Sequence, residues 1–330
     1  MKRRVVSGMR PTGKLHLGHL VGALSNWAPL QDGYDCFYFV ADWHALTSEY
    51  ADTSGLVPSA YDMVADWIAA GLDPERSTLF VQSLVPEHAE LFLLLSMTIP
   101  IPWLERVPTY KEQIEQLSDK DLSTLGFLGY PLLQTADIVM YGAHFVPVGE
   151  DQVAHLELSR EIVRRFHNFY GELFVEPQPL LTRFPRLPGL DNRKMSKSYN
   201  NTINLSDDAD AVRKKVMQMY TDPKRVRADI PGTVEGNPVF MYHDAFNPDT
   251  AELDDLKTRY RAGRVGDVEV KNKLARALNA QLEPMRARRA DVMSKPETLR
   301  EILHEGSRTA RAMAAETMER VRAAIKLKYR

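Results

Sequence analysis

The first half of the chain alternates short runs of β-branched and aromatic residues with longer segments in which apolar residues recur at helical spacing. The short runs predict strands at 4–7, 37–41, 78–82 and 144–148. The longer segments predict helices over 56–70, which ends at Gly71, and over 151–166. Strands that alternate with helices in this way are typical of βαβ units, so the pattern predicts an α/β fold with a parallel, doubly wound sheet.

The second half of the chain has a mainly helical pattern. It begins after a stretch over 176–188 that favours an extended loop because it contains Pro177, Pro179, Pro185 and Pro188. Near the C-terminal end, 299–303 and, after a break at Gly306, 310–324 predict a terminal helix with one apolar face. We therefore expect a Rossmann-like domain over 1–190 and a second, mainly helical domain over 191–330.

Length and charge limit the classes of protein that fit. At 330 residues the chain exceeds the size at which a single core keeps growing, which favours two domains. A charged share of 26% with a net charge of only -2 argues against disorder and against a uniformly basic nucleic-acid-binding protein. Any RNA partner must meet a local basic surface. Residues 286–330 carry 12 Lys/Arg and 6 Asp/Glu, which fits either a solvated helix face or part of such a surface.

Cys36 is the single cysteine and lies in an apolar run, where a buried thiol is expected rather than a ligand or a nucleophile. Disulfides and cysteine-based metal clusters are thereby excluded. The first residues do not resemble a signal peptide, and no apolar run reaches the length of a membrane span. We therefore expect a cytoplasmic protein that does not associate with membranes.

A glycine-rich turn over 7–13 follows the first strand and leads into His-Leu-Gly-His at 16–19, which we name the histidine motif. A strand, a glycine-rich turn and a helix in this order offer unpaired backbone N–H groups to a phosphate. His16 and His19, three residues apart, would lie on one side of the first turn and could both bind phosphate oxygens. Gly18 leaves room for a flat group against the backbone.

Three other interpretations of this segment compete. Residues 8–14 match the start of a P-loop, but Leu15 replaces the hydroxyl residue that binds magnesium and Pro11 removes a backbone donor. His16 and His19 could bind a metal ion, although no third ligand is evident from the spacing. They could also be core or capping histidines, as most isolated pairs are.

Lys-Met-Ser-Lys-Ser at 194–198, which we name the lysine loop, favours phosphate binding over these three interpretations. Two lysines with two hydroxyl side chains beside them make a compact cationic clamp for a polyphosphate. Alone, the segment could be a solvated loop. Its combination with the histidine motif predicts a site that activates a substrate with ATP.

The paired motifs resemble the two signatures of the class I aminoacyl-tRNA synthetases, and the whole chain resembles their tryptophanyl branch in particular. The segments that carry the resemblance are 11–19, 40–45, 130–138, 146–152 and 194–198. Tyrosyl enzymes share the fold and both signatures. Gly-Glu-Asp-Gln at 149–152 followed by His155, together with Ala-Asp-Ile at 136–138, is the pattern of the tryptophanyl branch.

The resemblance implies an ATP site and an activation step. His16 and His19 would stabilise the transferred α-phosphate, and Lys194 and Lys197 the departing pyrophosphate, because an ionised carboxylate needs positioning and charge neutralisation more than a base. Magnesium is expected with ATP, without a ligand from the protein and without any bound cluster or organic cofactor. The implied ATP-binding residues are Arg10, Pro11, Thr12, Gly18, His19, Gly149, Glu150, Asp151, Leu187, Lys194, Met195, Ser196, Lys197 and Ser198.

The resemblance also implies a tryptophan pocket. Asp137 would accept the indole N–H, which phenylalanine lacks and tyrosine places differently, and this would give discrimination without editing. Tyr130, His44 and Gln152 would surround the polar end of the substrate. The apolar and remaining pocket positions would be Ile138, Val146, Val148, Val6 and Gln134. Val6, Gln134 and Arg10 depart from the commoner bacterial pattern, in which an aromatic residue, a methionine and a glutamine stand there.

Family members are homodimers whose tRNA spans both subunits, so tRNA(Trp) and a second copy are the implied partners. Domain 1–190 would then bind ATP and the amino acid, and 191–330 would hold the lysine loop and the anticodon-binding helices. Some relatives carry a four-cysteine iron–sulfur cluster, which the single cysteine excludes here. A tyrosyl ligase and a catalytically silent paralogue that binds tryptophan or RNA are the alternatives, and intact motifs argue against the second.

Overall fold

The computed structural model describes residues 2–108, 110, 121–149, 152–181, 187–196 and 199–329. The chain forms two compact units. Unit 1 contains 1–13, 26–182 and 292–330, and unit 2 contains 14–25 and 183–291. These units differ from the expected domains 1–190 and 191–330: the histidine motif lies in unit 2, and the C-terminal segment lies in unit 1.

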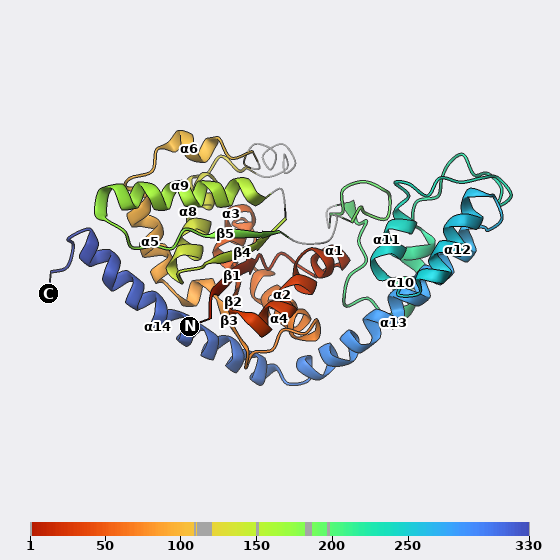
Figure 1. Cartoon of the computed structure of the whole chain (residues 1–330). Helices are drawn as coiled ribbons and strands as arrows, with labels where there is room; N and C mark the ends of the chain where they lie inside the picture. The colour runs from red at the N-terminus through yellow and green to blue at the C-terminus, as the bar shows by residue number, and fades with distance from the viewer. Residues whose placement is uncertain are drawn as a thin grey trace. The chain divides into compact units, whose positions relative to one another are not determined.

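A five-stranded parallel sheet forms the centre of unit 1, in the order β3-β2-β1-β4-β5. This order is the doubly wound arrangement, because β2 and β3 lie on one side of β1, and β4 and β5 lie on the other (Figure 1). The predicted fold class is therefore confirmed. The strands are β1 (Arg4–Met9), β2 (Asp35–Val40), β3 (Ser77–Val81), β4 (Phe145–Val148) and β5 (Gln178–Leu181).

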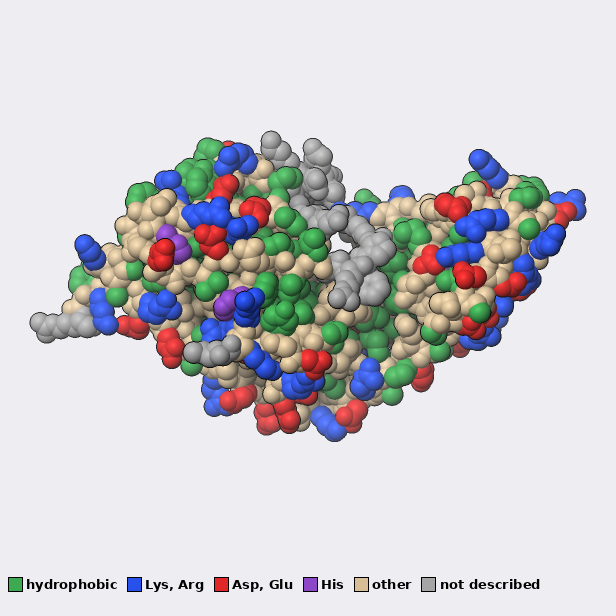
Figure 2. Space-filling model, viewed as in Figure 1, with side chains coloured by type: hydrophobic (Ala, Val, Ile, Leu, Met, Phe, Trp, Pro, Cys, Tyr) green, Lys and Arg blue, Asp and Glu red, His purple; other side chains and the backbone are tan. Residues whose placement is uncertain are grey.

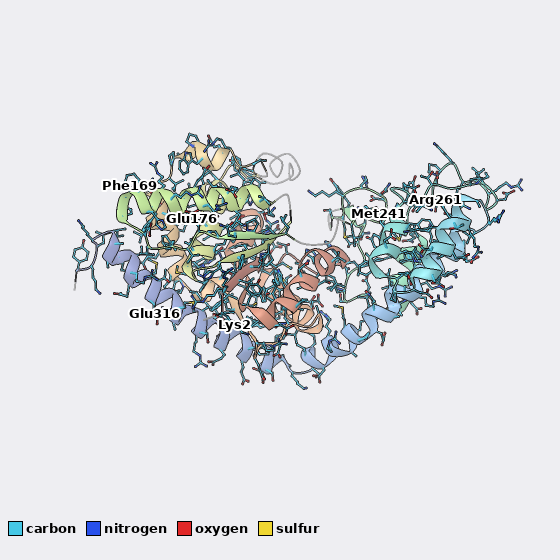
Figure 3. The ribbon with its side chains drawn as sticks, viewed as in Figure 1. Lys2, Phe169, Glu176, Met241, Arg261 and Glu316 are labelled. Atoms are coloured by element: carbon cyan, nitrogen blue, oxygen red, sulfur yellow. The ribbon has the colours of Figure 1, made fainter. Side chains whose placement is uncertain are left out.

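The edge strand β5 lies within the proline-rich stretch for which the sequence predicted an extended loop. Pro179 of β5 pairs with Val146 of β4 in the parallel register. A proline is tolerated there because, among the described residues, β5 pairs with a strand on one side only, so its missing N–H need not leave a gap in the ladder. Glu176, just before β5, accepts hydrogen bonds from Arg164 at 2.7–3.2 Å and so ties the strand to the helix that precedes it (Figure 3).

Helices cover the sheet of unit 1. The helices predicted over 56–70 and 151–166 correspond to α4 and α9, and Figure 1 shows α9 and α14 on opposite sides of the strands. No helix of the described residues is long and apolar enough to cross a membrane. The helical elements are α2 (Ser25–Gly33), α3 (Asp42–Glu49), α4 (Leu56–Ala69), η2 (Gln82–Leu84), α5 (Glu87–Ser96), α6 (Ile101–Glu105), α8 (Leu125–Met140), α9 (Val153–Tyr170) and α14 (Pro296–Ala324).

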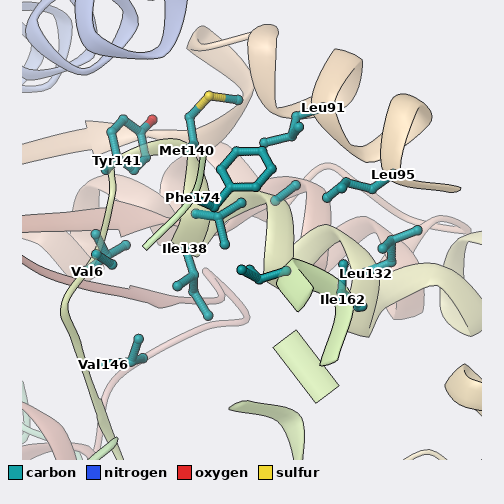
Figure 4. Close-up of a cluster of buried hydrophobic side chains, with 14 of the residues drawn as sticks. Val6, Leu91, Leu95, Leu132, Ile138, Met140, Tyr141, Val146, Ile162 and Phe174 are labelled. Carbon is teal, nitrogen blue, oxygen red and sulfur yellow. The ribbon is translucent and has the colours of Figure 1, made fainter. Parts of the chain in front are cut away.

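The hydrophobic core of unit 1 lies between these helices and the strands. Val6 of β1, Ile138 and Met140 of α8 and Leu91 of α5 belong to one buried cluster (Figure 4). Burial of each such side chain contributes roughly 1.5–3 kcal/mol, which explains why the strand and helix patterns are readable in the sequence.

The C-terminal helix α14 is continuous through Gly306, so the predicted break there is wrong. Gly306 lies so close to β3 that a Cβ atom would be 1.9 Å from the carbonyl oxygen of Leu79. The glycine therefore permits contact between helix and strand rather than ending the helix. Next to it, the Ser307 hydroxyl accepts the backbone N–H of Val81 at 3.2 Å. The predicted apolar face of α14 packs on unit 1, and this contact moves the segment out of the expected second domain.

Several basic residues of α14 are used within unit 1. Arg311 pairs with Glu87, and Arg322 pairs with Glu90 at 2.6 Å. Arg320 donates to the carbonyl oxygen of Leu173 at 2.9 Å. The sequence left the role of the basic residues in 286–330 undecided. These three form ion pairs and hydrogen bonds within unit 1.

Unit 2 is helical around its own core. Leu253, Leu256, Leu274 and Leu278 are buried in it. Arg225 is buried too, where its guanidinium donates to three backbone carbonyls and stacks on Tyr260. The helices are α1 (Leu17–His19), the π-helical turn η1 (Leu20–Leu24), α10 (Ala209–Met217), α11 (Pro238–Phe246), α12 (Thr250–Arg261) and α13 (Asp267–Met293).

Candidate functional site

The two histidines of the histidine motif hold each other at the start of α1. His16 is the N-cap residue, and its Nδ1 accepts the backbone N–H of Gly18 at 3.2 Å. The backbone N–H of His16 in turn donates to Nδ1 of His19 at 3.1 Å, and the two ring centroids lie 3.9 Å apart. The capping interpretation is thus correct for both Nδ1 atoms.

The first turn of α1 uses its own backbone donors. The N–H of Leu17 donates to the carbonyl of Ile203 at 3.0 Å, and that of His19 to the carbonyl of His16 at 2.8 Å. With Gly18 capped by His16, the expected unpaired backbone donors are replaced by internal partners. Because both Nδ1 atoms accept, each neutral ring carries its proton on Nε2.

The lysine loop meets the histidine motif inside unit 2, although the two are far apart in the sequence. A Cβ atom on Gly18 would lie 2.9 Å from the sulfur of Met195, so the Met195 side chain lies close against the backbone of Gly18. Lys194 is exposed. Lys197 and Ser198 lie outside the described residues. The structure therefore brings His16, Gly18, His19 and Met195 together within unit 2.

Asn201 is the buried residue that holds the lysine loop, and the sequence analysis did not find it. Its side-chain amide donates to the Asp191 carboxylate at 2.8 Å and to the Lys194 carbonyl at 3.0 Å. Its side-chain oxygen accepts the N–H of Ser196 at 2.9 Å. An amide can donate and accept at once, which lets one side chain fix both sides of the loop.

Asp137 lies in α8 with a side chain that is 0% exposed. Its Oδ1 is 2.6 Å from Nδ1 of His88 and its Oδ2 is 2.7 Å from Nε2 of His44. The amide of Gln82 donates to both oxygens at 2.9 Å. Burial raises the pKa of this carboxyl, but the hydrogen bond from His44 and the charge and hydrogen bond of His88 outweigh it and lower the pKa to about 2.

The sequence analysis missed Gln82 and His88. The available signal was position, because Gln82 follows directly after β3, at the carboxyl end of a parallel strand where site residues gather. His44, which the sequence analysis assigned to the polar end of the substrate, contacts Asp137.

A second polar cluster contains Tyr130, Gln134 and His155. The Gln134 side-chain oxygen is 3.0 Å from Nδ1 of His155, and the Tyr130 hydroxyl is 3.4 Å from Nε2 of the same ring. His155 is buried in α9, whereas Gln134 is half-buried in α8. His155 thus links two residues that the sequence placed in the tryptophan pocket.

The apolar residues predicted for the pocket are buried. Val6 is fully buried, and Ile138, Val146 and Val148 are at most 7% exposed and share the core cluster with it (Figure 4). They belong to β1, α8 and β4 and occupy positions of core residues.

The remaining predicted nucleotide residues are spread over both units. Arg10 is exposed, Pro11 buried and Thr12 half-buried after β1. The N–H of Gln152 donates to the Gly149 carbonyl at 3.0 Å, while Glu150 and Asp151 lie outside the described residues. Leu187 is buried. In the described part of the chain, no three His, Cys, Asp or Glu side chains are grouped so that they could hold a metal ion.

Comparison with known proteins extends these findings to the whole chain. The family described as "tRNA synthetases class I (W and Y)" matches residues 1–283. The tryptophan–tRNA ligase of Thermotoga maritima is 50% identical over 327 residues, which cover 99% of this chain and 100% of that protein. The enzyme of the same name from Treponema pallidum is 49% identical over 330 residues, with 99% and 98% covered.

Solved structures agree. The tryptophanyl-tRNA synthetase of Campylobacter jejuni, solved with ADP and tryptophan, superposes with a TM-score of 0.87 at 31% identity and covers 98% of this chain and 99% of that one. Family, sequence relatives and fold therefore coincide over nearly the full length. The chain belongs to the class I tRNA synthetases for tryptophan and tyrosine, in the branch of the tryptophan–tRNA ligases.

Proposed function

We propose that this chain activates L-tryptophan with ATP, releases pyrophosphate, and transfers the tryptophanyl group to tRNA(Trp). The observation that carries the ATP half of the proposal is the contact between Gly18 and Met195, which joins the histidine motif to the lysine loop within one compact unit. The full-length likeness to tryptophan–tRNA ligases supports the choice of amino acid.

In the activation step the tryptophan carboxylate attacks the α-phosphorus of ATP. One O–P bond forms, and the bond to the β-phosphate oxygen breaks, so that pyrophosphate leaves with its electron pair. The Nε2–H groups of His16 and His19 donate to the α-phosphate oxygens as negative charge develops there. Lys194 and Lys197 neutralise the pyrophosphate, and Mg²⁺ enters with ATP.

Other residues have supporting roles in this proposal. Arg10, Pro11, Thr12, Gly149, Glu150, Asp151, Leu187, Met195, Ser196 and Ser198 contact the nucleotide. Asp137 accepts the indole N–H, and its ionised state at neutral pH suits it to a donor. Tyr130, Gln134 and Gln152 bind around the substrate, with Val6, Ile138, Val146 and Val148 as the apolar wall. Unit 2 supplies the anticodon-binding helices, and charging takes place in the cytoplasm.

A second copy of the chain is the proposed partner of an apolar surface on unit 1. A hollow of about 360 Å³ is lined by Trp43, Leu46 and Tyr50 of the α3 region, Phe92 of α5 and Leu133 of α8. Leu125, at the start of α8, is 81% exposed, and Met97 and Ile101 are exposed nearby in the chain. Figure 2 shows hydrophobic side chains at the surface in the region where Figure 1 shows α6. Exposed apolar area of this kind marks an interface.

Pyrophosphate exchange over a panel of all amino acids tests the activation step. We expect exchange with tryptophan, and a loss of about 100-fold in Lys194→Ala because a charge that stabilises the leaving group is removed. Lys224→Ala, an exposed lysine of the same unit, is the matched control and should exchange normally. Exchange with tyrosine alone would contradict the proposal, and adenylate formation without charging of tRNA would favour a regulatory paralogue.

Sedimentation equilibrium tests the partner surface. Leu125→Asp should convert a dimer to a monomer, because a charge would replace an apolar side chain that is 81% exposed and whose neighbours in the chain, Thr124 and Gly126, line the hollow. Val57→Asp, at another exposed position of unit 1, should leave the dimer intact. A dimer that survives Leu125→Asp would exclude this surface.

A further inference from the structure

Both oxygens of the Asp137 carboxylate are occupied by hydrogen bonds from other side chains of the chain. Three side chains from three different elements reach it: His44 from α3, Gln82 from η2 and His88 from α5. Each oxygen already has two donors, since Gln82 contacts both and each histidine contacts one. No part of the carboxylate is exposed. An incoming indole N–H therefore needs one of these donors to leave.

Two of the three donors are fixed. Gln82 is fully buried, and its side-chain oxygen accepts the backbone N–H of Trp43 at 3.2 Å, which sets the orientation of the amide. His88 is fully buried as well, and its Nε2 lies 2.6 Å from the hydroxyl of Tyr141. The ionised Asp137 carboxylate can only accept, so Nδ1 carries the proton that His88 donates to it.

The third donor differs from these. The His44 side chain is 12% exposed, whereas those of His88 and Asp137 are 0% exposed. His44 reaches Asp137 through Nε2, at the tip of the ring, so a rotation of its side chain would uncover Oδ2 while Gln82 and His88 stay in place. Among the three donors, only His44 borders solvent, from which the substrate comes.

We propose that His44 is the replaceable donor of Asp137: it caps the carboxylate in the empty enzyme, and the indole N–H of tryptophan takes its place. This inference rests on the proposed function. The exchange bears on selection, because a side chain without an N–H group leaves His44 on the carboxylate, whereas tryptophan gives up the His44 hydrogen bond to Asp137 in return for its own. His44 then acts on selection rather than on the reacting atoms.

The test compares tryptophan with its benzothiophene analogue, in which sulfur replaces the indole N–H. The measured quantity is the ratio of kcat/KM for the two substrates in pyrophosphate exchange, in the wild type, His44→Ala and His44→Gln. If His44 and the indole N–H compete for Asp137, the carboxylate of His44→Ala lacks one hydrogen-bond donor. Tryptophan can supply that donor, and the analogue cannot. The ratio should then rise about tenfold or more in His44→Ala.

His44→Gln is the matched control, because the glutamine amide provides an N–H near the place of the histidine Nε2. Its ratio should stay within about threefold of the wild type, as expected when the competing donor is kept. Equal loss for both substrates in His44→Ala, with an unchanged ratio, would overturn the inference, since it would mean that His44 and the indole bind together.

Folding and the proposed function are checked separately. Dissociation constants for tryptophan and the analogue, measured by calorimetry without ATP, should show the same change in ratio, and circular dichroism should show that His44→Ala is folded. If the substitution unfolds the chain, His44→Asn, which is too short to reach Asp137, replaces it with the same expected rise. A wild type that does not exchange with tryptophan would instead contradict the proposed function.

Discussion

His16 and His19 are held in one tautomer by a reciprocal contact: the N–H of His16 donates to Nδ1 of His19, while Nδ1 of His16 caps the same helical turn. Each neutral ring therefore carries its proton on Nε2. The histidine motif thus caps its helical turn through one ring nitrogen of His16, and the proposed function assigns phosphate binding to the other.

The two nitrogens of His16 can be separated by substitution. His16→Asn keeps a good N-cap acceptor but removes the Nε2 donor, so we expect normal stability and a loss of about 100- to 1000-fold in kcat for pyrophosphate exchange. His16→Ala should lose activity to the same extent and about 1 kcal/mol of unfolding free energy as well. Urea unfolding and exchange kinetics on both variants decide this. Full activity of His16→Asn would remove Nε2 from the mechanism.

Asp137 should make stability depend on pH in the acid range. Its pKa falls from 3.8 in the unfolded chain to about 2 in the folded one, so its contribution is fully present above pH 3.8 and is lost as the pH falls through about 2. The shift corresponds to about 2 kcal/mol at neutral pH. Urea unfolding of Asp137→Asn should therefore show a deficit near this size at pH 7.

The same deficit should shrink by about 1 kcal/mol at pH 3, because the wild type then begins to lose the contribution. Asp254→Asn, at an exposed position, is the control and should match the wild type at both pH values. A deficit that does not change between pH 7 and pH 3 would show that the ionised state of Asp137 is not what stabilises the fold.

Asn201 and Gly189 should control the lysine loop from two sides. A Cβ atom on Gly189 would lie 2.1 Å from the Asn201 amide nitrogen, so Gly189→Ala pushes away the side chain that Asn201→Ala removes. Each variant should raise the KM for ATP and lower kcat, with up to about 100-fold loss in kcat/KM from misplaced lysines. Tryptophan binding without ATP should remain unchanged.

Gly266→Ala is the control for this pair, because its Cβ atom would find ordinary contact 3.5 Å from Ala228 in the same unit. It should retain wild-type kinetics. Equal losses in ATP and tryptophan binding by Asn201→Ala would indicate a general loss of structure instead of a displaced loop.

Gly306 should be essential for the attachment of α14 to unit 1. Gly306→Ala places a methyl group against the Leu79 carbonyl, so we expect a loss of about 1–3 kcal/mol in unfolding free energy. Gly33→Ala has open space around its Cβ atom and should cost less. Denaturant unfolding measures both, and equal stabilities would show that the helix can move away from the strand without cost.

Local patterns in the sequence were sufficient for much of the fold. Four strands and the α4 and α9 helices follow from periodicity and turn residues, because burial on a sheet or helix face depends on spacing along the chain. β5 was not predicted, because it contains Pro179, and a proline usually indicates a loop although an edge strand tolerates it. The break at Gly306 was wrong because a glycine is also required where a helix approaches a strand closely.

The sequence by itself determined the family and the two motifs, since both motifs are short runs whose chemistry is readable residue by residue. Tertiary structure alone decided which unit each segment joins, because α14 is attached by contacts with a strand more than 200 residues earlier. It also decided the partners of Asp137. His44, Gln82 and His88 come from separate elements, and their convergence on one carboxylate depends on how those elements pack around α8 rather than on any local pattern.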